Sequence, residues 1–170
     1  MKAGGASLRA VWGLFVLFAI LPPGVTESLG DLQSRFDRET NGVRKAKLLE
    51  KLGNAQLEET RRAGKAGDYT AVGLTLEKYR DNVRAALEAL KRQHPDAEKQ
   101  SNGYRQLEMH VRKGIREVDD VLLVSPEGYQ PPLQLVRHDL VGMDEEMLKM
   151  LFPRRPGDQH AAAPPAEKQP

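Results

Sequence analysis

The chain has 170 residues, no cysteine, and 26 lysine and arginine side chains against 24 aspartate and glutamate side chains. This length favours a single domain with a modest core, and the lack of cysteine excludes disulfides and thiolate metal sites. Lys2 and Arg9 lie in the N-terminal segment 1–26, which contains a long apolar stretch. Without this segment the chain carries 24 basic and 24 acidic side chains. A nucleic-acid-binding protein is expected to keep a basic stripe with aromatic residues nearby, so no nucleic-acid partner is predicted.

Residues 1–26 have the order of a secretory signal peptide: a charged start, an apolar stretch from Val11 to Leu21, and a Pro-Pro-Gly break at 22–24. The apolar stretch is shorter than the roughly 20 residues that a membrane-spanning helix needs. A cleaved signal peptide is therefore the first interpretation, and an uncleaved anchor is the alternative. Cleavage before Glu27 leaves a mature chain without a stable membrane span, periplasmic or secreted. An exported chain without cysteine is more typical of a bacterial envelope protein than of a small eukaryotic secreted domain.

Apolar residues recur at helical spacing along five segments of the mature chain. Ser28 is placed to cap a short helix over 29–39, and Asn41 to cap a long helix over 43–66. The remaining predicted helices are 69–94, preceded by the cap Asp68; 101–124, beginning at Ser101 or Asn102; and 132–152.

Three short segments separate the long helices. Gly67 suits the left-handed C-terminal cap of a helix, and Asp68 follows it directly, so the helices on either side are expected to form a tight antiparallel hairpin. Residues 95–103 are polar and rich in turn formers. The segment 125–132, SPEGYQPP, contains three prolines and a glycine and is not expected to be helical.

No segment shows the apolar alternation of a strand, so the predicted fold is all-α: a small antiparallel helical bundle of three or four long helices plus a short N-terminal helix. The predicted domain covers 27–152, and residues 153–170 are expected to form a disordered tail rich in proline and alanine. Four predicted helices contain an interior glycine, at Gly53, Gly73, Gly114 and Gly142. Close approach of helix backbones is one hypothesis for these glycines, and a tolerated surface position is the other.

The candidate metal ligands are histidines and methionines. His94, His110, His138 and His160 include no pair one helical turn apart. Met143, Met147 and Met150 lie on one face of the last predicted helix. Such a stripe is typical of a core, although thioethers also bind Cu(I) or line an adaptable partner groove.

Catalytic motifs are not evident. The carboxylate pairs Glu58–Glu59, Asp119–Asp120 and Glu145–Glu146 are adjacent in helices, where neighbouring side chains point about 100 degrees apart. No serine has a nucleophile-elbow context, and no phosphate-binding glycine loop is present. Neither an enzymatic activity nor a cofactor is predicted.

Residues 36–87 resemble a helical hairpin of exported bacterial proteins of unknown function. The resemblance rests on K-L-G-x-A-Q at 51–56, A-G-D-Y at 66–69 and L-x-x-Y-R-D at 76–81. The hairpin is also similar, more loosely, to the helix pairs of tetratricopeptide-type repeats, although their period of about 34 residues does not recur. The resemblance implies a helical-hairpin architecture and brings no catalytic residues with it.

The first functional hypothesis is an exported, non-enzymatic helical protein that serves in protein interaction or scaffolding in the bacterial envelope. Tyr69, Tyr79 and Tyr104 are the candidate packing or partner-contact residues, with Met143, Met147 and Met150 as candidate groove residues. The alternative is a periplasmic metal-sensing or metal-buffering bundle that uses His110, His138 and the methionines as ligands. A homodimer is a further hypothesis, because a chain with 39% hydrophobic and 5% aromatic residues has a lean core.

Overall fold

The computed structural model describes residues 27–153, so the predicted signal peptide and most of the predicted tail lie outside the described residues. Within the described range the chain is helical and contains no strand, which confirms the all-α prediction. No helix in this range is long and apolar enough to cross a membrane. The elements are α1 (Leu29–Arg38), α2 (Gly42–Lys65), α3 (Tyr69–Gln93), α4 (Ser101–Val124), the 3₁₀ turn η1 (Glu127–Tyr129) and α5 (Gln130–Leu151).

The predicted caps begin the first three helices. The Ser28 hydroxyl accepts the Asp31 N–H at 3.1 Å, and the Asp31 carboxylate accepts the Ser28 N–H at 3.4 Å, so α1 begins with a reciprocal capping box. Asn41 accepts the Arg44 N–H at the start of α2, and Asp68 accepts the Ala71 N–H at the start of α3. Each side chain binds an N–H group that has no partner inside its helix.

The turn between α2 and α3 is as compact as predicted. Gly67 has a positive φ of 74°. The Asp68 N–H donates to Ala63 O at 3.0 Å, and the Gly67 N–H donates to Gly64 O at 3.0 Å. These two hydrogen bonds form a Schellman motif, which binds carbonyls left free at the end of α2.

The prediction that residues 125–132 are not helical is wrong for most of that segment. The break is short, because η1 begins at Glu127 and α5 begins at Gln130, two residues before the predicted start. Pro131 and Pro132 lie in the first turn of α5. The first N–H groups of a helix have no intrahelical acceptor, so proline loses no hydrogen bond there.

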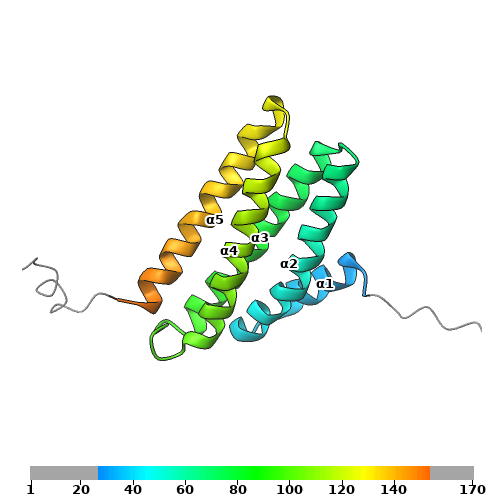
Figure 1. Ribbon diagram of the computed structural model, residues 1–170. Helices are drawn as coiled ribbons and strands as arrows, with labels where there is room; N and C mark the ends of the chain where they lie inside the picture. Colours follow the sequence, from blue (N-terminus) through cyan, green and yellow to red (C-terminus); the bar gives the residue numbers. More distant parts are fainter. Residues whose placement is uncertain (1–26, 154–170) are drawn as a thin grey trace, which may run out of the picture.

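The four long helices form two hairpins, α2–α3 and α4–α5, that lie side by side (Figure 1). Consecutive helices run in opposite directions, whereas α2 runs parallel to its neighbour α4, and α3 runs parallel to α5. Gln106 of α4 donates to the Glu50 carboxylate of α2 at 2.8 Å, and Arg84 of α3 lies 2.9 Å from Asp139 of α5. α1 packs against α2 on the side of the molecule away from α5 (Figure 1).

The apolar faces predicted from the spacing form one continuous core. Leu76 and Val83 of α3, Leu107 of α4 and Leu140 of α5 are completely buried. α1 adds Leu32 and Phe36 to this cluster.

Polar groups also hold α1 in place. Gln33 and Asn82 of α3 exchange two side-chain hydrogen bonds, of 3.1 and 2.9 Å, and the Asn82 amide also donates to Gln56 of α2 at 3.3 Å. The Lys45 ammonium lies 4.4 Å from the centre of the Phe36 ring and donates to Phe36 O at 2.8 Å. This short helix is therefore attached by two apolar side chains and a small set of buried or half-buried polar contacts.

The interior glycines divide into two groups. A Cβ on Gly53 would lie 2.9 Å from Tyr79 Cε2 and would overlap the His110 ring, and a Cβ on Gly114 would lie 2.7 Å from Tyr79 Cζ. A Cβ on Gly73 or Gly142 would meet nothing within 4 Å. Gly53 and Gly114 therefore make room for aromatic rings of neighbouring helices rather than for a close approach of backbones, and the hypothesis of close approach is wrong for Gly73 and Gly142.

We expect Gly114→Ala to lower the free energy of unfolding by about 1–3 kcal/mol, because the added methyl group must displace the Tyr79 ring. Gly73→Ala is the matched control, and it should leave stability unchanged or raise it by up to about 1 kcal/mol, because alanine has the higher helix propensity. Urea denaturation of both variants measures the difference. Equal destabilisation by the two substitutions would contradict the assigned packing.

Candidate functional site

Tyr79 and His110 lie at the centre of the fold, where α2, α3 and α4 meet. The Tyr79 ring is fully buried, and its hydroxyl donates to His110 O at 3.0 Å. The two rings are 5.6 Å apart in an edge-to-face arrangement. Gly53 and Gly114 leave the space that these rings occupy. Burial raises the pKa of Tyr79, so the ring stays neutral and acts as a packing element.

His110 is a buried, neutral histidine. It is 7% exposed, and its Nε2 atom has no hydrogen-bond partner among the described residues. Burial lowers the pKa of His110 to about 4, and the nearby Lys113 ammonium adds to this effect while Glu50 opposes it. A protonated imidazole is therefore disfavoured at this position in the folded chain.

A small cavity of about 240 Å³ lies over His110 between α2 and α4. Two hydrogen bonds cross between the helices there, from Gln106 to Glu50 at 2.8 Å and from Lys113 to Asn54 at 2.6 Å. Four of the polar side chains that line the cavity thus bind one another in two pairs, whereas His110 Nε2 binds none of them. We interpret this arrangement as a polar seam between two parallel helices.

The candidate metal ligands have different surroundings. His110 packs between α2 and α3, whereas His138 is exposed on α5. Met143 is 8% exposed and Met147 is fully buried, so both belong to the core, and Met150 packs beside it. Across residues 27–153, no group of three His, Cys, Asp or Glu side chains is arranged to hold a metal ion.

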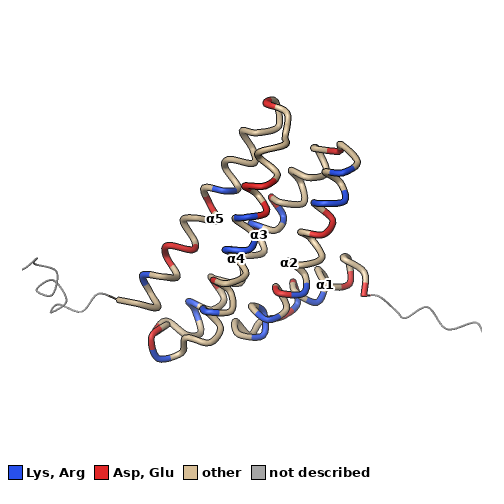
Figure 2. The backbone as a smooth tube through the Cα atoms, in the orientation of Figure 1, with Lys and Arg blue, Asp and Glu red and all other residues tan. Residues whose placement is uncertain are grey.

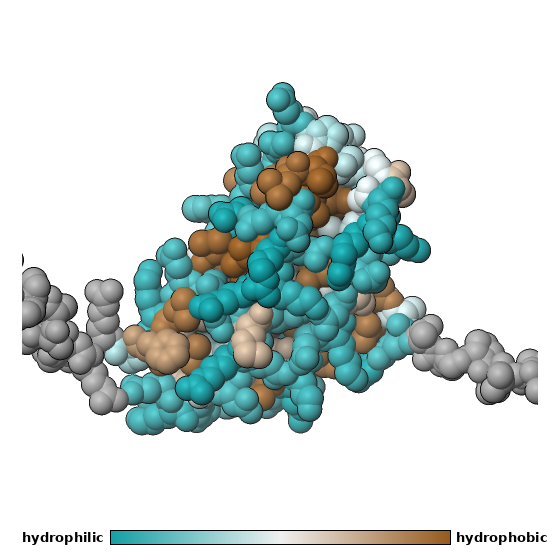
Figure 3. Space-filling model, viewed as in Figure 1, coloured by the Kyte–Doolittle hydropathy of each residue, from teal (hydrophilic) through white to brown (hydrophobic). Residues whose placement is uncertain are grey.

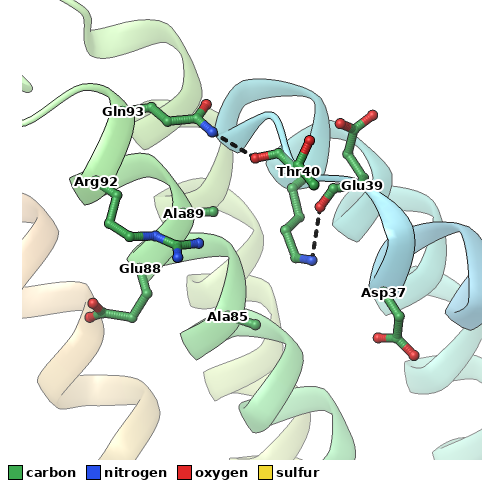
Figure 4. Close-up of a pocket in the computed structure, with 9 residues that line it drawn as sticks. Asp37, Glu39, Thr40, Ala85, Glu88, Ala89, Arg92 and Gln93 are labelled. Atoms are coloured by element: carbon green, nitrogen blue, oxygen red, sulfur yellow. Dashed lines mark hydrogen bonds between the residues drawn. The ribbon is translucent and has the colours of Figure 1, made fainter.

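Another cavity, of about 740 Å³, lies between the α1–α2 turn and the end of α3 (Figure 4). Gln93 donates to Thr40 O at 2.6 Å across its upper edge, and the Lys45 ammonium donates to Glu39 O at 3.1 Å. Burial lowers the pKa of Lys45. Lys45 is thus used to hold the end of α1. The lining side chains carry both charge signs and include no serine or histidine to act as a nucleophile and its base.

A different kind of surface lies where α4 ends and α5 begins. The Tyr69 hydroxyl, from the start of α3, donates to Val124 O at 3.1 Å, and the Tyr69 and Tyr129 rings are 5.6 Å apart. Val124 is 69% exposed and Tyr129 is 42% exposed. We call these three residues the tip patch. It joins the two hairpins and presents apolar surface to solvent.

The tip patch lies beside further apolar surface, and the helices around it carry charges of both signs. Figure 3 shows apolar surface near the end of the molecule where α4 meets α5 in Figure 1, and Leu123, beside the patch, is 84% exposed. Basic and acidic residues are interspersed along the helices (Figure 2). The described chain therefore offers an apolar contact point among mixed charges. Large exposed apolar side chains that gather in one place are typical of interaction sites.

The structure separates the three tyrosines named from the sequence. Tyr79 and Tyr104 are fully buried, and the Tyr104 hydroxyl donates to His94 O at 2.7 Å, which fixes the α3–α4 loop. Tyr69 is half-buried and belongs to the tip patch. Sequence reasoning missed Val124 and Tyr129. A tyrosine between a glycine and prolines in an otherwise polar turn was the available signal for Tyr129.

Comparison of the chain with protein-family models, curated proteins and solved structures finds no match.

We expect stability to fall as the pH is lowered from about 6.5 to about 4, by up to about 3 kcal/mol. In this window the unfolded chain protonates His110 while the folded chain does not, so protons favour unfolding. Below the folded pKa both states bind the proton, and the contribution of His110 becomes constant. Urea denaturation at several pH values, with NMR titration of the His110 ring, measures both quantities.

His110→Gln should flatten this part of the pH dependence, whereas His138→Gln, at an exposed position, serves as the matched control and should not. An NMR midpoint for His110 near 6.5 would contradict the buried, neutral assignment.

Proposed function

We propose that the protein is an exported, non-enzymatic interaction module of the bacterial envelope and that the tip patch contacts its protein partner. The observation that carries this proposal is the cluster of the half-buried Tyr69 with the exposed Val124 and Tyr129, held in place by contacts between the two hairpins. Export is proposed from the sequence of residues 1–26.

The chemistry of the tip patch suits a protein partner. Aromatic side chains provide large contact areas and lose few rotamers on binding, so they are enriched at interfaces. The Tyr69 hydroxyl is already bound to Val124 O, so this ring needs no new polar partner when it is covered. Because the patch joins the start of α3, the end of α4 and η1, its shape depends on the folded arrangement of both hairpins.

Two further features support an interaction module. The two hairpins lie side by side, and stacked helix pairs offer extended surfaces to a partner. Four side chains that line the two cavities described above bind neighbouring groups of the fold: Lys45, Gln93, Gln106 and Lys113. These cavities offer no assembled catalytic groups among their lining residues.

The test is site-specific photo-crosslinking of the full chain in its own host. A photoreactive phenylalanine at Tyr129 should give one dominant crosslinked partner, identified by mass spectrometry. The matched control is the same group at Leu74, an exposed apolar position on α3 that is 64% exposed. The control should give little of that product, because Leu74 lies outside the tip patch.

Val124→Ser with Tyr129→Ser should lower the yield of the crosslinked partner about tenfold, as expected for a loss of about 1.4 kcal/mol of binding free energy. In this variant the photoreactive group is placed at Leu123, beside the patch. An unchanged urea midpoint would show that the fold is intact. The same set of products from Leu74, or no product from the tip patch, would overturn the proposal.

A further inference from the structure

We infer that a pocket at the turn between α1 and α2 binds the phosphate group of a ligand through three arginine side chains. This inference goes beyond the proposed function, because the pocket lies at the opposite end of the helical bundle from the tip patch (Figure 1). The pocket has a volume of about 410 Å³. We call it the arginine pocket, and its lining residues are Arg35, Arg38, Glu39, Thr40, Arg44 and Leu48.

The short turn between α1 and α2 brings these arginines together. α1 ends at Arg38 and α2 begins at Gly42, so the last turn of one helix lies close to the first turn of the other. Arg35 and Arg38 are three residues apart and share one face of α1. Arg44 and Leu48 are four residues apart and share one face of α2. The pocket is therefore bordered by guanidinium groups from two helices, with Leu48 as an apolar wall.

Arg38 is the arginine of the pocket with the most free donors. A guanidinium group carries five N–H donors. Arg38 donates its Nε–H to Ser34 O at 3.1 Å, and no carboxylate pairs with it among residues 27–153. Its Nη donors therefore have no partner within this range. Arg35 binds Glu27 through Nη1, which leaves its other N–H groups for a ligand.

The charge of the arginine pocket favours an anion. Glu39 is the only carboxylate among the lining residues, and it is bound to Arg44 at 3.0 Å and to the Asn41 N–H at 2.8 Å. These hydrogen bonds lower the pKa of Glu39. Three arginines against one glutamate leave a charge of +2. The charge is +1 if Glu27, the ion-pair partner of Arg35, is included.

The neighbouring cavity of about 740 Å³ is less suited to an anion. Its lining carries two basic and three acidic side chains, which leaves a charge of −1: Lys45, Arg92, Asp37, Glu39 and Glu88. An anion that approaches the α1–α2 turn is therefore expected to bind in the arginine pocket.

Three guanidinium groups match a phosphate better than a carboxylate. One planar guanidinium already binds both oxygens of a carboxylate through two parallel hydrogen bonds. A phosphate has three acceptor oxygens and up to two negative charges, so it can bind several guanidinium groups at once. The Thr40 hydroxyl makes no hydrogen bond among residues 27–153 and is a further donor at the pocket. The ligand is thus a phosphomonoester or the phosphate of a lipid head group, which share this chemistry.

NMR titration of the full chain with inorganic phosphate tests the site directly. The probe is the Nε–H signal of Arg38, followed at constant ionic strength so that screening of the surface charges does not change. Phosphate should shift this signal with a Kd of about 1 mM or below. Sodium acetate should bind about tenfold more weakly, because its two oxygens occupy a single guanidinium.

Arg38→Gln should weaken phosphate binding about tenfold, which corresponds to about 1.4 kcal/mol. In this variant binding is followed at the backbone amide of Thr40. The matched control is Arg116→Gln, because Arg116 is an exposed arginine on α4 that makes no hydrogen bond or ion pair among residues 27–153. Arg38→Lys keeps the charge without the planar fork, so it should recover little of the loss. Unchanged urea midpoints would show that the variants are folded.

Two further measurements distinguish the two sources of the phosphate. The first is sedimentation of the full-length Arg38→Gln and Arg116→Gln chains with vesicles of equal parts phosphatidylglycerol and phosphatidylcholine. About tenfold weaker vesicle binding by Arg38→Gln than by Arg116→Gln identifies a lipid head group. The second is titration with glycerol 3-phosphate. A Kd of about 1 mM or below, with equal vesicle binding by the two variants, identifies a soluble phosphomonoester.

Absence of a saturable shift with inorganic phosphate, equal weakening by Arg38→Gln and Arg116→Gln, or equally tight binding of acetate would overturn the assignment of the arginine pocket. These outcomes are independent of the proposed function, which is read by photo-crosslinking at Tyr129, at the other end of the bundle.

Discussion

The fold depends on the packing of one aromatic ring between two glycines. Tyr79 of α3 occupies the space beside Gly53 and Gly114, and its hydroxyl binds a carbonyl of α4. Any larger residue at either glycine would require the ring to move, so the separation of the two hairpins is set there. The contacts between the hairpins, including the tip patch, rely on this separation because they link helices from both sides.

Most of the fold could be predicted from the sequence because its signals are local. Apolar spacing located the helices, and Ser28, Asn41 and Asp68 marked their starts, since a cap acts within one turn of its own position. The start of α5 was misplaced because prolines are compatible with a first helical turn. The parallel relation of α2 to α4, and the different roles of Gly114 and Gly73, depend on residues far apart in the sequence, and spacing alone does not reveal such contacts.

The candidate site was only partly predictable for the same reason. Tyr69 was singled out as an anchor, but its partner Val124 lies 55 positions away, and only the fold brings them together. The methionine stripe of α5 was compatible with a core or a groove, and the packing of α3 and α4 over it determines that Met147 is buried. His110 carried no local sign of burial, because the space for its ring comes from a glycine on another helix.

The weak attachment of α1 has a consequence for the order in which the molecule opens. A helix of 10 residues is too short to be stable alone, so its backbone hydrogen bonds last only while Leu32, Phe36 and the Gln33–Asn82 amides stay docked. The amide protons of α1 are then exchanged by local opening, without unfolding of the four long helices. A force applied to the chain at residue 27 would thus detach α1 before the four long helices separate.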